Sequence, residues 1–179
     1  MFKKLCVLAV LSASSISFAA GIAVLDIDKV RMETKAGQSI AQQLTNLQNS
    51  LNDKFMKTRQ DFDKKKQELD QKKTILSQEV FAKKEAEFNN KLADFRKDLQ
   101  KEAGNLEQMQ QVALEDFNLV ARDIIDNIAK EEKYSQIFPA AVMVYADPQS
   151  DITNKVIIAI DKKIDNIKLK DPVAASPAK

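Results

Sequence analysis

The chain has 179 residues, of which 28 are Lys or Arg and 26 are Asp or Glu, and its formal net charge is +2. It has no histidine, one cysteine and three scattered glycines. These counts exclude a Ser-His-Asp site, a zinc site of ordinary ligands and a glycine-rich phosphate loop. We therefore expect no enzymatic activity, no metal, no nucleotide and no other cofactor.

Residues 1–19 have the pattern of a secretory signal peptide. Lys3 and Lys4 precede the apolar run 5–11, and small residues at positions 17 and 19 predict cleavage after Ala19. Cleavage removes both lysines and Cys6, so the mature chain has no net charge and no cysteine. We expect an exported, soluble protein that is stabilised by packing or assembly, because it cannot form disulfides.

Residues 20–35 are expected to form the first part of a small base. The β-branched run 22–27 predicts a strand. Asp28 is placed to cap a short helix through Val30 and Met32.

Residues 36–133 contain no proline, and their apolar stripe predicts a hairpin of two long antiparallel helices. Forward from Leu44 to Leu69 the stripe advances in alternating steps of three and four, close to the coiled-coil period. Read backward from Leu106 to Phe81 it repeats the same steps, and each facing pair of residue numbers sums to 150. That register places the tip at residues 74–77. The predicted seam between the helices contains Leu44, Leu51, Phe55, Phe62, Leu69, Phe81, Phe88, Leu92, Phe95, Leu99 and Leu106.

The returning helix is longer than its partner, so its lower part, from Met109 to Ile128, is expected to pack into the base. Gly104 lies near the junction and weakens the helix by about 1 kcal/mol relative to alanine. Two explanations are open for it: close packing of the two helices, or a hinge between arm and base.

Residues 134–170 are expected to complete the base with two strands and a helix. Apolar runs at 134–138 and 141–146 predict the strands, and Asp151 is expected to cap the helix. Residues 171–179 are predicted to be a disordered tail. The predicted fold class is α+β: a small β-rich oligomerisation base formed by the two chain ends, with the hairpin inserted between them. The residues expected to build the oligomerisation base are Ile22, Val24, Ile137, Val142 and Val144.

The order of four segments resembles the Skp/OmpH-like family of periplasmic chaperones. These segments are the strand that starts at Ile22, Leu76-Ser-Gln-Glu near the tip, the run 142–145 and the run 151–156. The resemblance implies a periplasmic homotrimer whose three arms enclose a cavity for unfolded outer-membrane proteins, without ATP. Well-known members are strongly basic, whereas the mature chain is neutral, so at most weak contact with an anionic membrane surface or lipopolysaccharide is expected.

Client contacts are expected beside the seam, where adaptable side chains are free: Met56, Ile75, Leu76, Val80 and Met109. The charge is uneven, since residues 54–84 hold ten Lys or Arg against five acids, and residues 85–133 hold seven against twelve. The distal lysines either attract acidic client segments or membrane surfaces, or form a solvated coat: Lys64, Lys65, Lys66, Lys72, Lys73, Lys83 and Lys84.

Two functional hypotheses follow. The first is an ATP-independent periplasmic holdase chaperone that prevents unfolded outer-membrane proteins from aggregating in transit. The second is a non-catalytic envelope protein that uses the hairpin as a spacer or docking rod. Nucleic-acid binding is not expected, because the basic section is flanked by acid and lacks interleaved exposed aromatics.

Overall fold

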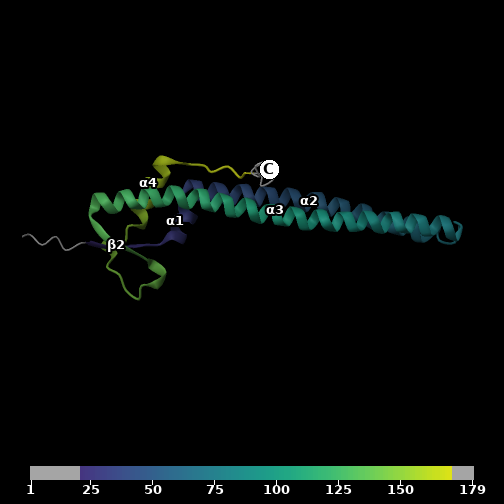
Figure 1. The fold of residues 1–179 in the computed structure, drawn as a ribbon, viewed down its shortest axis with the longest axis horizontal. Coiled ribbons are helices and arrows are strands. Elements are labelled where there is room, and N and C mark those ends of the chain that lie inside the picture. The colour runs from purple at the N-terminus through teal and green to yellow at the C-terminus, as the bar shows by residue number, and fades with distance from the viewer. Residues whose placement is uncertain (1–20, 171–179) are drawn as a thin grey trace, which may run out of the picture.

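In the computed structural model, which describes residues 21–170, a small base carries one long projecting arm (Figure 1). The elements in chain order are β1 (Gly21–Leu25), α1 (Ile27–Glu33), α2 (Lys35–Lys72), α3 (Gln78–Glu132), β2 (Tyr134–Pro139) and α4 (Thr153–Lys163). Short 3-10 turns occupy Ala140–Val142 and Pro148–Ser150. The α+β fold with an inserted helical hairpin is thus confirmed. The expected signal peptide, its cleavage at Ala19 and the expected tail lie outside the described residues.

The arm consists of α2 and α3, which run side by side in opposite directions (Figure 1). At 1.5 Å per residue, the 38 residues of α2 span about 57 Å. Thr34 caps α2 by accepting a hydrogen bond from the Gly37 N–H, and Ser77 caps α3 by accepting one from the Val80 N–H. A Cβ at Gly104 would have no neighbouring atom within 4 Å, so close packing of the helices does not explain that glycine.

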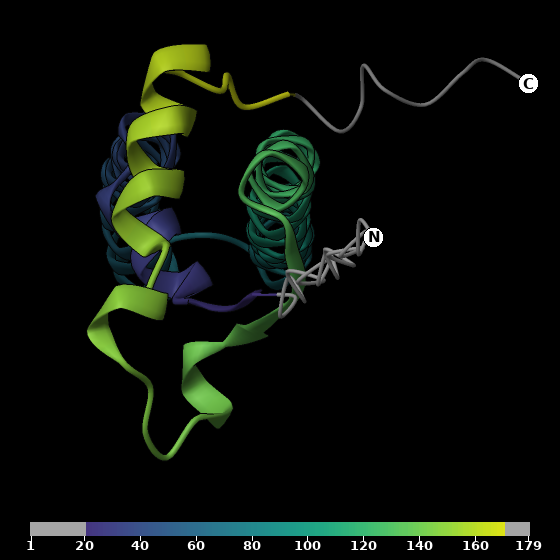
Figure 2. The same cartoon turned by 90° about the vertical axis from the view of Figure 1, so that its left-hand side faces the viewer.

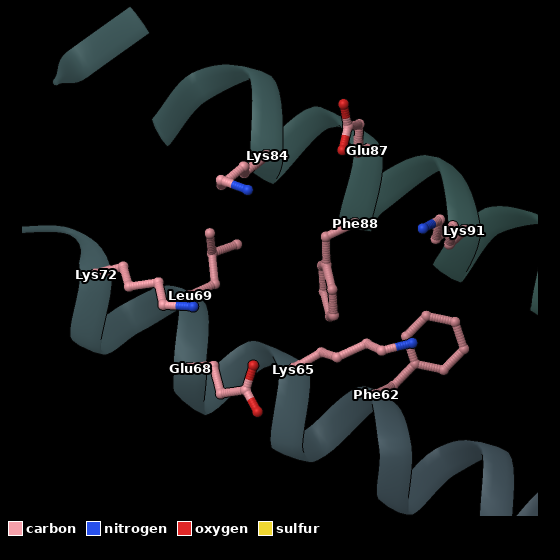
Figure 3. A pocket seen from close by; sticks show the side chains of 9 residues that line it. All are labelled: Phe62, Lys65, Glu68, Leu69, Lys72, Lys84, Glu87, Phe88 and Lys91. Atoms are coloured by element: carbon pink, nitrogen blue, oxygen red, sulfur yellow. The ribbon is translucent and has the colours of Figure 1, made fainter. Parts of the chain in front are cut away.

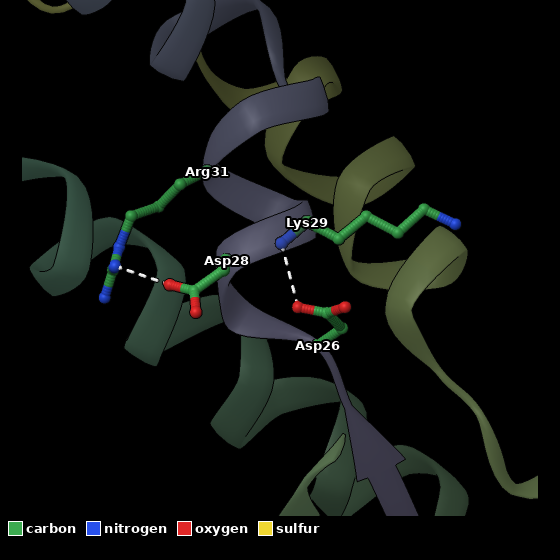
Figure 4. A network of polar contacts seen from close by, with 4 residues as sticks. All are labelled: Asp26, Asp28, Lys29 and Arg31. Atoms are coloured by element: carbon green, nitrogen blue, oxygen red, sulfur yellow. Dashed lines mark hydrogen bonds and ion pairs between the residues drawn. The ribbon is translucent and has the colours of Figure 1, made fainter. Parts of the chain in front are cut away.

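The helix α1 begins two residues earlier than the sequence predicted, because its cap is Asp26 and not Asp28 (Figure 4). The Asp26 Oδ1 accepts a hydrogen bond from the Lys29 N–H at 2.9 Å. Asp28 lies in the first turn, where its carboxylate pairs with Arg31 at 2.9 Å. The Asp26 N–H donates to the Thr153 hydroxyl at 3.0 Å, which ties the start of α1 to the start of α4.

The sheet contains two parallel strands, with Ile22 opposite Gln136 and Leu25 opposite Pro139. The other edge of β1 is partly closed, because the Ile152 N–H donates to the Val24 carbonyl at 3.0 Å. The prediction of a second strand at 141–146 is wrong: this segment is a 3-10 turn followed by irregular chain. Pro139 ends β2, because its ring nitrogen has no N–H to continue the ladder. The outer edge of β2 stays unpaired within the described chain, and residues 141–146 do not fold back onto it.

The fully buried core lies in the base, where β1 and α1 meet the lower parts of α2 and α3 and the helix α4. Its largest members include Val30, Phe117, Val156 and Ile160. The expected packing of lower α3 into the base is confirmed by Phe117, Ile124 and Ile128, which are all buried. The helix α4 packs against α1 and α3 and, to a lesser extent, against α2 at the root of the arm (Figure 2). Asp151 stands one residue before the helix cap, Ile152, and accepts a hydrogen bond from the Thr153 N–H at 2.8 Å.

Candidate functional site

Stacked phenylalanine rings hold the middle of the arm together. The rings of Phe55 and Phe95 lie 5.8 Å apart and those of Phe62 and Phe88 lie 5.7 Å apart, both edge to face. The Phe62 ring also contacts Phe95 at 5.4 Å. Such pairs contribute about 0.5–1.5 kcal/mol each beyond the area they bury. Both edge-to-face pairs therefore match the predicted hairpin register, in which the numbers of facing residues sum to 150.

The seam is nevertheless only half-buried along the arm, because two helices cannot enclose the stripe between them. All eleven predicted seam residues have intermediate exposure, whereas full burial on α2 ends at Ile40 and on α3 begins at Ala113. The phenylalanines therefore stabilise the hairpin and also remain reachable from its sides. Client contacts were expected beside the seam, and the half-buried seam offers apolar surface next to those positions.

One side of the seam opens into a groove of about 640 Å³, here called the arm groove. Its floor is made of seam residues, and its walls of residues that follow them directly in sequence. The lining consists of Asn52, Phe55, Met56, Arg59, Phe62, Asp63, Leu92, Phe95, Arg96 and Leu99. Apolar rings beside two guanidinium groups and one carboxylate can bind an extended apolar segment while tolerating varied polar groups at its edges.

The polar wall of the arm groove was not among the residues expected from the sequence: Asn52, Arg59, Asp63 and Arg96. A signal for it was present, because each of these residues directly follows a stripe position on its helix. Residues that follow the stripe by one lie on one flank of the helix, and those that precede it lie on the other. A second groove, at the base, lies on the same flank as the arm groove and has a largely apolar lining that includes Met32, Leu44 and Leu114.

The five expected client-contact residues do not form one site. Met56 lines the arm groove and is 56% exposed. Ile75, at the tip, is 81% exposed, Val80 is also exposed, and Leu76 is half-buried. Met109 is half-buried and lies 29 residues further along α3 than Val80, a separation of about 44 Å. A long client could contact all five residues, but a short peptide could not.

Three of the seven distal lysines meet at a pocket on the opposite flank, near the tip (Figure 3). In this view Leu69 and Phe88 point toward each other between the helices, and charged side chains surround them. The charged lining comprises Lys65, Lys72, Lys84 and Lys91 with Glu68 and Glu87. Lys91 and the two glutamates were not among the expected residues.

The other distal lysines are not part of this pocket. Lys64, Lys66, Lys73 and Lys83 are exposed, and Lys66 pairs with Asp70 at 3.5 Å. No ion pair in the described part of the arm joins Lys65 to Glu85, which the hairpin register places opposite each other. The distal lysines therefore remain largely available to an anionic partner.

The residues expected in the oligomerisation base divide into two groups. Val24 is only 4% exposed and belongs to the protomer's own core, and Ile137 packs against that core. Their side chains contribute to the packing of the protomer itself. Ile22, Val142 and Val144 are exposed. Together with the exposed side chains of Phe138, Met143 and Tyr145 they form what we call the base patch.

Perturbed titratable groups lie in the base, where ion pairs and hydrogen bonds hold α4. A hydrogen bond from Lys163 lowers the pKa of Asp123, and hydrogen bonds from Thr153 lower the pKa of Asp151. A hydrogen bond to Glu132 raises the pKa of Lys155. These shifts follow from structural contacts between α3 and α4 or at the start of α4. Within residues 21–170 no group of three or more carboxylate, Cys or His side chains could hold a metal ion, and no helix is long and apolar enough to cross a bilayer.

Comparison with known proteins is consistent with this architecture. The family described as outer membrane protein (OmpH-like) matches residues 21–160. A crystal structure of a proposed outer membrane chaperone (OmpH-like) from Caulobacter crescentus CB15 has a TM-score of 0.80 and 20% identity. The match covers 84% of this chain and 89% of that chain, which shows a shared fold. No curated protein gave a match.

Proposed function

Because the chain belongs to the OmpH-like family, we propose that it is an ATP-independent periplasmic holdase for unfolded outer-membrane proteins. The family supports a periplasmic chaperone role in general. The holdase mechanism, the client class and the export to the periplasm are the parts that we add. They rest on the arm groove and on the export pattern in residues 1–19.

The observation that carries the proposal is the half-buried seam at the floor of the arm groove. An unfolded outer-membrane protein exposes strands in which apolar side chains alternate with polar ones. Phe55, Phe62 and Phe95 offer such strands an apolar surface, and Met56 adapts to side chains of different shape. Each contact is small, so many weak contacts along the arm can hold a client and still release it without consuming fuel.

Assembly into a homotrimer is the second part of the proposal, with three arms around a shared cavity. The outer edge of β2 has no strand beside it within the described chain, and the base patch exposes apolar side chains next to that edge. An open edge with apolar neighbours favours pairing with another copy. Light scattering should give the mass of three chains at micromolar concentration, and a stable monomer would contradict the assembly.

An aggregation assay tests the holdase directly. An unfolded outer-membrane β-barrel protein is diluted out of denaturant with and without a molar excess of the mature chain, and turbidity is followed. We expect suppression of turbidity that does not change when ATP is added. Met56→Ala should weaken the suppression, whereas the matched variant Met32→Ala, at an exposed methionine of the base outside the arm groove, should weaken it less.

Absence of suppression by the correctly assembled protein would contradict the holdase. It would leave the alternative, an envelope spacer or docking protein that uses the arm as a rod. Retained suppression in a variant that cannot assemble would contradict only the shared cavity. Weak contact between the distal lysines and an anionic membrane surface belongs to the same proposal, and vesicle sedimentation at low and high salt measures it.

A further inference from the structure

The last described residues, 164–170, form an extended segment that leaves α4 and runs along the root of the arm (Figure 1). We call this segment the strap. Its first residue, Ile164, is extended, with φ −144° and ψ 144°. In the end-on view the strap crosses above the space between α2 and α3 (Figure 2). The OmpH-like match ends at residue 160, so the strap lies outside the matched residues.

The side chain of Gln43 on α2 makes hydrogen bonds to the strap backbone on both sides of Lys168. The Gln43 Nε2 donates to the Ile167 carbonyl at 2.8 Å, and the Gln43 Oε1 accepts from the Leu169 N–H at 3.3 Å. The carboxamide thus satisfies an acceptor and a donor two residues apart, in the way that a neighbouring strand would. Every residue except proline offers these two backbone groups, so this recognition does not depend on the bound sequence.

The side chains of the strap add an apolar and a charged contact. Ile167 and Leu169 pack against the base core, while Lys168 between them is exposed, as expected when alternate residues of an extended chain face the same side. At the end of the strap, the Lys170 Nζ pairs with Asp116 of α3 at 2.5 Å. Asn166 is fixed at its start by the Ser39 hydroxyl at 2.7 Å.

The strap and the arm groove lie on opposite flanks of the hairpin. Gln43 and Asp116 directly precede the stripe residues Leu44 and Phe117, whereas the polar wall of the arm groove directly follows stripe residues. Binding at Gln43 therefore neither blocks the arm groove nor uses its residues.

We propose that Gln43 and its neighbours form a second peptide-binding site, which the strap occupies as a built-in competitor and from which an unfolded client segment displaces it. The ligand class is an extended segment with apolar side chains at alternate positions, followed by a basic residue. Strands of outer-membrane β-barrels have this alternation. The assignment of clients as the displacing ligand rests on the proposed function, whereas the site itself does not.

The first experiment tests the site without any client, in the complete mature chain. A fluorescent peptide with the sequence of residues 162–170 is titrated into wild type, into Ile167→Ser/Leu169→Ser, whose strap has lost its apolar contacts, and into the matched control Lys168→Ser. Apparent affinity scales with the fraction of sites left free, so the double variant should bind the peptide roughly tenfold tighter than wild type and the control. Adding Gln43→Met to the double variant should abolish this gain while circular dichroism stays unchanged. Equal binding by all variants, or no saturable binding up to millimolar peptide, would overturn the site.

The second experiment asks whether clients displace the strap. Hydrogen exchange at the Leu169 N–H is measured in wild type with and without a saturating unfolded β-barrel protein, and binding is monitored separately by sedimentation. We expect at least a severalfold acceleration when the client binds. Unchanged exchange with the client demonstrably bound would overturn displacement but leave the holdase intact. Absence of client binding would contradict the holdase, and the peptide titration would then decide the site on its own.

Discussion

Removing the central ring of the arm tests whether the phenylalanine stack is chiefly a structural seam. Phe62 contacts both Phe88 and Phe95, so Phe62→Ala deletes two of the three ring contacts between α2 and α3. A fully buried phenylalanine costs about 3–5 kcal/mol when truncated to alanine. Phe62 is only half-buried, so about half of that is expected from lost burial, with a further contribution from the ring contacts. We expect the free energy of opening of the arm to fall by about 2–3 kcal/mol.

Native-state hydrogen exchange measures this loss where it occurs. At 1.4 kcal/mol for each factor of ten, amides in the middle of the arm should exchange roughly 30 to 150 times faster in Phe62→Ala. Amides of the base around Phe117 should keep their protection, because the fully buried core lies there. Met56→Ala, on the same helix but 56% exposed, serves as the control and should change exchange less than tenfold.

Comparing the two variants separates arm stability from client contact. The double variant Phe62→Ala/Phe88→Ala should show a coupling of about 0.5–1.5 kcal/mol between the rings. If arm amides of Phe62→Ala exchanged at the same rate as in wild type while client binding was lost, the structural role of the seam would be refuted. The phenylalanines would then act mainly as client contacts.

Three further predictions concern the glycines, the distal lysines and one carboxylate. Gly104→Ala should raise the arm's stability by up to about 1 kcal/mol, because its Cβ meets open space in mid-helix, and hydrogen exchange measures it. Gly37→Ala should lower the free energy of unfolding by about 2 kcal/mol or more in urea titration, since its Cβ would lie 1.7 Å from a backbone carbonyl oxygen of α1. Equal effects at the two glycines would contradict the close approach of α1 to α2. Lys72→Glu/Lys84→Glu should weaken binding of an acidic unfolded client severalfold at low salt and not near 1 M salt, where the Debye length is about 3 Å; unchanged affinity at low salt would support a solvated coat. The pKa of Asp151 lies below 3.8 in the fold, so its stabilising effect is complete above pH 3.8 and is lost as the pH falls through the folded pKa. The stability advantage of wild type over Asp151→Asn should therefore shrink below pH 3.8 in acid titrations, and an advantage that grows there would contradict the shift.

The cap residues show how local chemistry decides the ends of helices. At α3, Ser77 follows the turn at the tip and its side chain accepts a hydrogen bond from the Val80 N–H, so a local contact alone sets this helix end. At α1, however, Asp26 and Asp28 compete for the same role. The hydrogen bond from the Asp26 N–H to Thr153 decides in favour of Asp26, and that contact joins residues 127 positions apart.

The sequence by itself determined the arm. Its alternating steps of three and four, and the constant sum of facing residue numbers, depend only on helical periodicity and on a short turn at the tip. The pairs Phe55–Phe95 and Phe62–Phe88 could be written down before any coordinates, because a helix fixes which residues face its neighbour.

Only the tertiary structure decided the base and the surfaces available to partners. An apolar run such as 141–146 becomes a strand only when it pairs with an edge, and here the chain enters a 3-10 turn after Pro139, while Ile152 takes the second edge of β1. How far the seam remains exposed depends on how many helices surround it, and the strap depends on hydrogen bonds between Gln43 and residues more than 120 positions away. Periodicity fixes neighbours along a helix, but long-range contacts decide what remains free to bind.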